Sequence, residues 1–192
     1  MDVAVAAAGL VLTSPVQAAA ALVVGRDLGS PVLFRQQRPG FGGRPFTLVK
    51  FRTMRDSRVV PGLAQSDAER LTPLGRWLRA TSIDELPELW NVLRGDMSLV
   101  GPRPLLLEYL DRYTPEQARR HEARPGLTGL AQVSGRNKLS WSEKFALDVW
   151  YVDNMSIRLD LWIMWRTIRT VATRRGVTAS DAETMPEFKG VV

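Results

Sequence analysis

The sequence predicts a single α+β domain, mostly helical, that carries one β-hairpin, an N-terminal membrane helix and amphipathic helices at a membrane interface. An uncharged stretch runs from Val3 to Val24, and as a helix it would span roughly 30 Å, about the thickness of the hydrocarbon layer of a bilayer. Two β-rich apolar runs flank a series of turn formers at residues 38–45. Later apolar residues recur at helical spacing, and a length of 192 residues suits one domain.

The composition favours an anionic partner. Lysine and arginine number 26 against 20 acidic residues, which gives a formal net charge of +6. Nucleic acid, nucleotide phosphates and anionic lipid are all compatible with such a charge. The sequence contains no cysteine, which excludes disulfides and thiolate metal sites. It also lacks a recognition-helix motif and an aromatic, basic platform for single strands, so we expect no nucleic-acid partner.

Residues 1–25 are expected to form the membrane helix. The first two residues include no lysine or arginine, which is not typical of a secretory signal peptide. Pro15, preceded by Ser14, lies in the middle of the stretch, where a proline removes a backbone hydrogen bond and predicts a kink. The two half-helices could enter and leave on the same face of the membrane or form a kinked span, and hydropathy does not distinguish these arrangements.

Basic residues follow the membrane helix closely. By the positive-inside tendency they place the bulk of the protein, residues 26–192, in the cytoplasm. These basic residues are Arg26, Arg35, Arg38 and Arg44.

Residues 32–34 and 46–51 are expected to be the two strands of the β-hairpin, because turn formers separate them. Side chains alternate along a strand, so Lys50 and Arg52 point to the same face of the second strand. The two cations therefore converge on one locus, although long basic side chains are also ordinary solvated strand positions.

A helix is expected to follow at Thr72 and Pro73, which suit the N-cap and the first helical position. Arg76 and Arg79 lie three residues apart on this helix. They can therefore present a second basic edge.

Two adjacent carboxylates, Asp84 and Glu85, either cap a helix or take part in a reaction. Ser82 and Glu85 have capping-box spacing, but Pro87 would then cost a hydrogen bond inside the helix. A helix with Asp84 as N-cap avoids this cost. It also buries an apolar stripe at i, i+3, i+4 and i+7, formed by Leu86, Leu89, Trp90 and Leu93. The helix dipole favours ionised carboxylates there, and an ionised aspartate is a competent nucleophile. From these residues alone, a cap is the more common role.

Two later arginines occupy positions suited to binding an anion. Arg103 lies between Pro102 and Pro104, which hold the chain extended, and a preorganised guanidinium suits bidentate phosphate binding. An incidental arginine in a proline-rich connector is the alternative. Arg136 ends a glycine-punctuated loop, residues 124–137, of a kind that lets backbone approach a phosphate or a ring.

The C-terminal third carries three further features. Thr114 and Pro115 predict the start of another helix. His121 is expected at the surface, because the sequence offers no second histidine as a metal partner. Residues 159–171 combine tryptophans with leucine, isoleucine and nearby arginines, which fits an interfacial helix at least as well as a soluble core helix.

Six stretches occur along the chain in an order that is typical of one family. They are the hydrophobic N-terminus with Ser14-Pro15, PVLFRQQRPG, KFRTM, LRATSIDELPELWNVLRGDMSLVGPRP, RPGLTGLAQVSGRN and MPEFKG. Together they resemble the bacterial sugar transferase family, the monotopic polyprenol-phosphate phosphoglycosyl transferases. The resemblance covers nearly the whole chain, and the Asp-Glu and Pro-Arg-Pro blocks are its most specific part. The chain is similar to the minimal catalytic form, since larger members carry additional membrane helices.

The resemblance implies a role for each candidate residue. Asp84 corresponds to the catalytic nucleophile, which attacks the β-phosphate of a UDP-sugar. Glu85 corresponds to a second catalytic residue, the ligand of Mg²⁺ or of Mn²⁺ in its place. The implied substrate-binding residues are Lys50, Arg79 and Arg103 for phosphate and Arg136 for the nucleotide sugar, with Arg52 added from strand geometry.

The implied reaction transfers a phosphosugar to polyprenol (undecaprenyl) phosphate and releases UMP. Two displacements through an aspartyl-phosphosugar intermediate predict ping-pong kinetics. The product would be the first membrane intermediate in the biosynthesis of a glycoconjugate, such as an exopolysaccharide, an O-antigen, a capsule or a glycoprotein glycan.

The resemblance also implies a topology. Residues 1–25 would form a re-entrant membrane helix with its bend at Ser14-Pro15, and residues 26–192 a catalytic domain on the cytoplasmic face of the bacterial inner membrane. Two alternatives remain, a membrane-attached metal-dependent phosphohydrolase that uses water as final acceptor, and a basic peripheral protein that binds nucleic acid. The sequence identifies neither the sugar, nor the glycan pathway, nor the oligomeric state.

Overall fold

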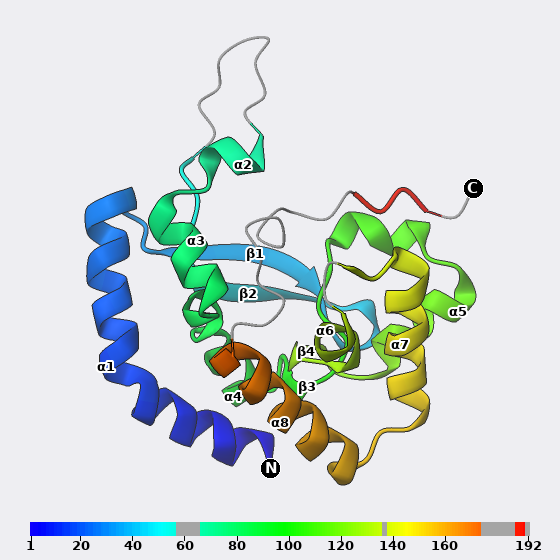
Figure 1. Cartoon of the computed structure of the whole chain (residues 1–192). Helices are drawn as coiled ribbons and strands as arrows, with labels where there is room; N and C mark the ends of the chain where they lie inside the picture. Colours follow the sequence, from blue (N-terminus) through cyan, green and yellow to red (C-terminus); the bar gives the residue numbers. More distant parts are fainter. Residues whose placement is uncertain (57–65, 136–137, 174–186, 191–192) are drawn as a thin grey trace.

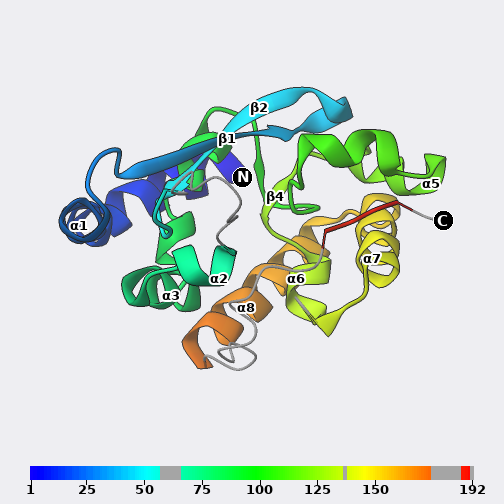
Figure 2. The ribbon, with the colours of Figure 1, turned by 90° about the horizontal axis from the view of Figure 1, so that it is seen from above.

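The computed structural model describes residues 1–56, 66–135, 138–173 and 187–190. The fold is α+β, as predicted, and helices surround two short two-stranded sheets (Figure 1). Helix α1 lies on one flank and α7 on the opposite flank, with the first sheet between them in both views (Figure 2). The helices and strands are α1 (Asp2–Leu28), β1 (Leu33–Pro39), η1 (Phe41–Gly43), β2 (Pro45–Phe51), α2 (Asp67–Arg70), α3 (Pro73–Ala80), η2 (Ile83–Glu85), α4 (Glu88–Leu93), β3 (Ser98–Val100), η3 (Leu107–Arg112), α5 (Pro115–Ala118), η4 (Arg119–Glu122), β4 (Gly126–Thr128), α6 (Leu130–Ser134), α7 (Trp141–Asp153) and α8 (Ile157–Thr173), where η marks a 3₁₀ turn.

Helix α1 continues through Pro15 and changes direction part-way along its length (Figure 1). A proline at this position has no N–H to donate to the carbonyl of Val11, four residues earlier. The hydroxyl of Ser14 donates to that carbonyl instead, at 2.8 Å. The serine therefore satisfies the polar group that the proline leaves without its helical partner, which is how a helix tolerates proline in an apolar setting.

Both halves of α1 pack on the rest of the domain. Ala6 is buried in an apolar cluster with Leu89 of α4, and Val24 is buried in a second cluster with Phe51 of β2. Residues 11–19 between these contacts are exposed or half-buried, and Leu12 has a relative accessibility of 79%. Among the residues that the structure describes, α1 is the one helix long and apolar enough to cross a membrane.

The predicted hairpin is confirmed. Strands β1 and β2 pair antiparallel, with Phe34 opposite Lys50 and Arg38 opposite Phe46. The buried side chain of Asn91 on α4 accepts a hydrogen bond from the Val49 amide at 3.1 Å and donates to the Thr47 carbonyl at 2.7 Å. This amide couples α4 to the strand that carries Lys50.

The predicted start of the third α-helix is also confirmed. Thr72 is the N-cap of α3 and Pro73 its first residue, and the Thr72 hydroxyl accepts a hydrogen bond from the Gly75 amide at 3.0 Å.

The prediction that a helix begins with Asp84 as its N-cap is wrong. Ser82 adopts a left-handed conformation with φ 56°, and the chain then forms the 3₁₀ turn η2 before α4 begins at Glu88, with Pro87 as its N-cap. Neither helical start carries a side-chain cap hydrogen bond. Asp84 lies inside this 3₁₀ turn, four residues before α4 begins, so it does not cap the helix. Pro87 suits the N-cap position because it has no N–H to lose.

The predicted apolar stripe on this helix is correct for three of its four members. Leu86, Leu89 and Leu93 pack in the main apolar cluster, whereas Trp90 is 51% exposed. Trp90 therefore lies on a side of α4 that faces away from this cluster.

A second sheet, which the sequence did not predict, joins β3 and β4 in parallel, with Ser98 opposite Gly126 and Val100 opposite Thr128. The backbones approach closely beyond this pairing. A Cβ atom on Gly101 would lie 2.3 Å from the Arg124 carbonyl oxygen, so the position requires glycine.

The expectation that His121 lies at the surface is wrong. His121 is buried, because the η4 turn packs against η1 and the imidazole ring lies 5.6 Å from the ring of Tyr113. Burial, together with the charge of Arg120, lowers the pKa of His121 to about 4, so the ring is neutral at physiological pH.

The C-terminal segment that the structure describes packs on the domain through Phe188. This side chain is buried in a cluster of aromatic rings from η3 and α7. Its partners include Phe145, at a ring separation of 4.9 Å, and Tyr109, whose hydroxyl accepts a hydrogen bond from the Phe188 amide at 3.2 Å.

Helix α8 exposes apolar side chains over much of its length. Arg166 lies 5.2 Å from the Trp162 ring and Arg169 lies 5.6 Å from the Trp165 ring. Apolar and aromatic residues with adjacent arginines are typical of an interfacial helix. The large exposed side chains of α8 are Ile157, Leu161, Trp162, Trp165 and Ile168.

Candidate active site

Asp84 lies in the η2 turn and is buried, with a relative accessibility of 3%. The turn contacts β2, α3 and α1, so three elements hold it in place. Ser82, directly before the η2 turn, adopts the left-handed conformation. This conformation costs a non-glycine residue on the order of 1 kcal/mol, and such strain concentrates at functional sites.

The pKa of Asp84 is raised to about 6. Burial is the main cause, and the negative charge of Glu85 is the second. The positive charges of Lys50, Arg79 and Arg103 act in the opposite direction. The carboxylate is therefore ionised near neutral pH while it is shielded from water. A shielded, ionised carboxylate is a stronger nucleophile than a hydrated one.

Glu85 and Arg103 form an ion pair between their side-chain ends. Glu85 raises the pKa of the Arg103 guanidinium, which is partly exposed, with a side-chain accessibility of 43%. Arg103 thus stands beside the two carboxylates with part of its surface open to a ligand.

Glu88 is a third carboxyl group in the site and was missed in the sequence. It is 2% exposed, and burial followed by the charge of Glu85 raises its pKa to about 8. Its spacing of four residues from Asp84 and three from Glu85 is the signal that could have found it, since a helical turn places such residues on one side.

Three further cations converge on these carboxyl groups. Lys50 of β2 lies 5.5 Å from the Phe34 ring, and burial lowers its pKa while the charge of Asp84 raises it. Arg79 of α3 donates from Nε to the Thr53 hydroxyl at 3.1 Å, and burial lowers its pKa as well. The sequence prediction that these two residues share a site is consistent with this geometry.

Arg38 of β1 is the third cation and was not among the predicted site residues. Burial lowers its pKa, and so does the charge of Arg103, while Glu88 raises it. Its Nη2 donates to Gln36 at 2.6 Å, and its buried Nε has no partner in the described part of the chain. The site therefore draws cations from β1, β2, α3 and the loop after β3.

Known proteins match the chain along most of its length. The bacterial sugar transferase family matches residues 1–174. The chain belongs to this family. An uncharacterized sugar transferase of Bacillus subtilis, EpsL, is 56% identical over 88% of this chain and 83% of its own length.

Two further relatives carry more specific names. A UDP-glucose:undecaprenyl-phosphate glucose-1-phosphate transferase of Caulobacter vibrioides is 45% identical over 90% of this chain and 68% of its own length. An undecaprenyl-phosphate galactose phosphotransferase of Salmonella typhimurium is 40% identical over 87% of this chain but only 38% of its own length.

In this sugar transferase, Arg52 is not brought together with the other cations. It is 6% exposed, its guanidinium donates to the carbonyls of Leu28 and Gly29 at the end of α1, and it lies 3.6 Å from Asp56. The geometry gives it a role in holding the end of α1. Arg136, the predicted nucleotide-sugar contact, lies outside the described residues.

The carboxylates of the sugar transferase fit a hard divalent cation. Within the described ranges, no three carboxylate or imidazole side chains converge as a complete metal cage. Mg²⁺ does not need one, because it is commonly held by one or two carboxylates, water and substrate phosphates. Burial is the main cause of the raised pKa values of Asp84 and Glu88, and the negative charge of Glu85 adds to it. A bound cation would relieve this repulsion, so Glu85 could hold Mg²⁺ at this site.

Proposed function

We propose that this sugar transferase moves a phosphosugar from a UDP-sugar to undecaprenyl phosphate and releases UMP. The observation that carries the proposal is a buried aspartate with a pKa of about 6, beside a second carboxylate and among cations from separate elements. Lys50, Arg79 and Arg103 provide the positive charge that a diphosphate requires, and Asp84 provides the nucleophile.

The first displacement forms a covalent intermediate on Asp84. A carboxylate oxygen bonds to the β-phosphorus of the donor while the bond from that phosphorus to the bridging oxygen breaks, and UMP leaves with the electron pair. The acceptor's phosphate oxygen then attacks the same phosphorus and restores the carboxylate. The cations balance charge on the phosphoryl oxygens in both steps, and Mg²⁺ held by Glu85 would supply further neutralisation of the diphosphate.

The names of the relatives support the acceptor and the donor class. The Caulobacter protein is named for UDP-glucose and undecaprenyl phosphate, and the Salmonella protein for galactose and undecaprenyl phosphate. Because the sugars in these names differ, we assign the acceptor and a UDP-linked donor and leave the sugar open. The reaction would begin glycoconjugate assembly at the inner membrane.

Membrane attachment is supported by the placement of α1. Its first turn and its last turns pack on the same domain, and Ser98 donates a hydrogen bond to Asp2. A helix that leaves from and returns to one body suits re-entrant insertion, with its exposed middle in the lipid. Helix α8, with its exposed tryptophans and adjacent arginines, suits the interface of the same leaflet. The basic residues that follow α1 would place the catalytic domain on the cytoplasmic side by the positive-inside tendency.

The experiment uses the full chain in detergent with Mg²⁺. A panel of UDP-sugars is screened for UMP release with undecaprenyl phosphate, and labelled UMP is tested for exchange into the donor without lipid. Exchange without lipid and a phosphosugar mass on the peptide that contains Asp84 support the covalent route. Lipid-independent release of sugar phosphate would instead indicate the phosphohydrolase alternative.

A further inference from the structure

Arg120 is a buried arginine outside the set of charges that meet at Asp84. It is 2% exposed and lies on the η4 turn. Its Nε and Nη2 both donate to Asp148 of α7, at 3.0 and 2.7 Å, and the rings of Tyr113 and Phe145 lie 5.8 and 5.7 Å from its guanidinium carbon. The ion pair is therefore enclosed by aromatic side chains.

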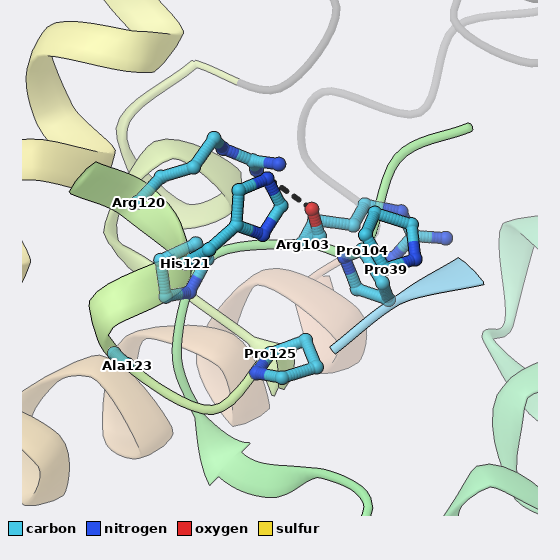
Figure 3. Close-up of a pocket in the computed structure, with 8 residues that line it drawn as sticks. Pro39, Arg103, Pro104, Arg120, His121, Ala123 and Pro125 are labelled. Atoms are coloured by element: carbon cyan, nitrogen blue, oxygen red, sulfur yellow. Dashed lines mark hydrogen bonds between the residues drawn. The ribbon is translucent and has the colours of Figure 1, made fainter. Parts of the chain in front are cut away.

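The same guanidinium reaches the main chain of Arg103. Nη2 of Arg120 donates to the Arg103 carbonyl at 2.7 Å, across a small crevice (Figure 3). Arg120 and His121 lie on one side of this crevice, and Arg103 and Pro104 lie on the other.

The backbone before Arg103 is anchored from the opposite direction. The Gly101 amide donates to the Thr128 carbonyl at 2.9 Å, and the Gly126 amide donates to the Pro102 carbonyl at 3.0 Å. The loop from β3 is thus held by β4 on one side and by Arg120 on the other. Arg120 holds this loop through the Arg103 carbonyl, which belongs to the peptide group between Arg103 and Pro104.

We propose that Arg120 is a positioning residue, which fixes the main chain of Arg103 so that its guanidinium reaches Glu85 and the phosphates of the donor. The proposal rests on the function proposed above. It assigns to Arg120 no contact with substrate, and it assigns to Asp148 the task of orienting Arg120.

A purely structural role does not account for the arrangement as well. A buried ion pair is seldom more stabilising than an apolar pair of the same volume, because both charges lose their hydration. The apolar pair, however, has no donor for the part-buried Arg103 carbonyl, which would lose this hydrogen bond. The Arg120–Asp148 pair supplies a donor with a fixed direction, and small displacements of a catalytic group reduce rates strongly.

The main experiment is a double-mutant cycle on the full chain in detergent. Arg120→Met with Asp148→Leu removes both charges, so no uncompensated charge remains in the core. We expect radiolabelled UMP release from the donor to fall about 10–100-fold in this paired variant. In the Arg103→Ala background the same paired change should produce little further loss, because no guanidinium is left to position.

Two results overturn the proposal. One is a paired variant that releases UMP at the rate of the parent protein, and the other is an equal loss in the presence and absence of Arg103. If the paired variant does not fold, Arg120→Lys enters the same cycle, since it keeps the charge and loses the forked geometry. The matched control is Arg119→Met with Asp153→Leu, which removes an ion pair from the neighbouring residue and should leave the rate unchanged.

A spectroscopic measurement separates this proposal from the proposed function. The guanidinium Nη–H signals of Arg103, assigned by their loss in Arg103→Ala, should exchange with water about 10-fold faster in the paired variant than in the parent, because Nη2 donates to Glu85 in the parent. If no UDP-sugar yields UMP with the parent, the proposed function fails, and this exchange rate still decides the role of Arg120. Unchanged exchange at Arg103 would overturn the positioning role.

Discussion

The hydroxyl of Ser98 donates a hydrogen bond to the carboxylate of Asp2, at 2.5 Å. Ser98 begins β3 and Asp2 begins α1, so the first turn of the apolar helix is joined to the strand that leads into the Arg103 loop. The beginning of α1 and the Arg103 loop therefore belong to one packed unit. A helix that crossed the bilayer would have to break this contact.

We predict that the N-terminus and the catalytic domain face the same side of the membrane. Because the chain has no cysteine, single cysteines at the exposed positions Val3 and Glu108 can be compared directly. In intact spheroplasts a membrane-impermeant maleimide should label neither, and after permeabilisation it should label both. Labelling of position 3 alone in intact spheroplasts would contradict the re-entrant topology.

Asp84→Asn should abolish activity and raise the stability of the metal-free protein. A pKa of about 6 in place of the ordinary 3.8 corresponds to about 3 kcal/mol against the ionised form in the folded state. This cost is absent below pH 4, where both states are protonated, and it is complete above pH 6. Thermal unfolding in EDTA should therefore show a gain for Asp84→Asn that grows between these pH values. A variant that is less stable than the parent at pH 7 would contradict the assignment of burial as the main cause.

The donor half-reaction should lose activity as the pH falls through about 6, because Asp84 must be ionised to attack. The measurement is kcat/KM for UMP release with donor below saturation, which reports the free enzyme. The three carboxyl groups interact, so the apparent pKa belongs to the set. Lys50→Met removes a charge that lowers the pKa of Asp84 and should move the acidic limb to higher pH. If the acidic limb of the pH profile does not move in Lys50→Met, that limb does not report the ionisation of Asp84.

Glu88→Gln should retain most activity at pH 7. The pKa of Glu88 is about 8, so its carboxyl is protonated at neutral pH, and a glutamine has nearly the same shape and charge. Because this pKa is raised from 4.5, the parent loses stability between pH 4.5 and 8 relative to the variant. Activity and unfolding would be compared with those of Glu108→Gln at an exposed position, which should match the parent at every pH. A large loss of activity in Glu88→Gln at pH 7 would show that the ionised form is needed.

Local rules predicted the elements whose signals lie within a few residues. The cap formed by Thr72 with Pro73 depends on adjacent residues, and so does the hairpin turn after Arg38. Arg103 was predicted in an extended, restricted backbone because prolines restrict the conformation of their immediate neighbours. In the structure its ion pair with Glu85 brings the Asp-Glu and Pro-Arg-Pro segments together, which no local rule predicted.

The features that the sequence did not predict depend on contacts between distant segments. Pairing of β3 with β4 joins two three-residue strands, which are too short to show a period. Glu88 is an ordinary polar residue in the sequence and becomes buried only when β2 and α4 pack together. His121 was expected at the surface, but the η4 turn that carries it and Arg120 packs against η1 and α7, and both residues are buried.

Phe188→Ala should destabilise the domain although it lies near the C-terminus. Its ring is 4% exposed and contacts Tyr109 and Phe145, two rings from different elements. Truncation of a buried phenylalanine typically costs about 3–5 kcal/mol, which corresponds to a fall in Tm of roughly 6–20 °C for a domain of this size. The adjacent control, Glu187→Ala, removes only an exposed ion pair with Arg112 and should change Tm little. Because Phe145 also covers Arg120, we expect Phe188→Ala to lower donor-dependent UMP release at temperatures where the variant is still folded. Equal effects of the two substitutions on Tm would show that the aromatic cluster is not what holds this segment.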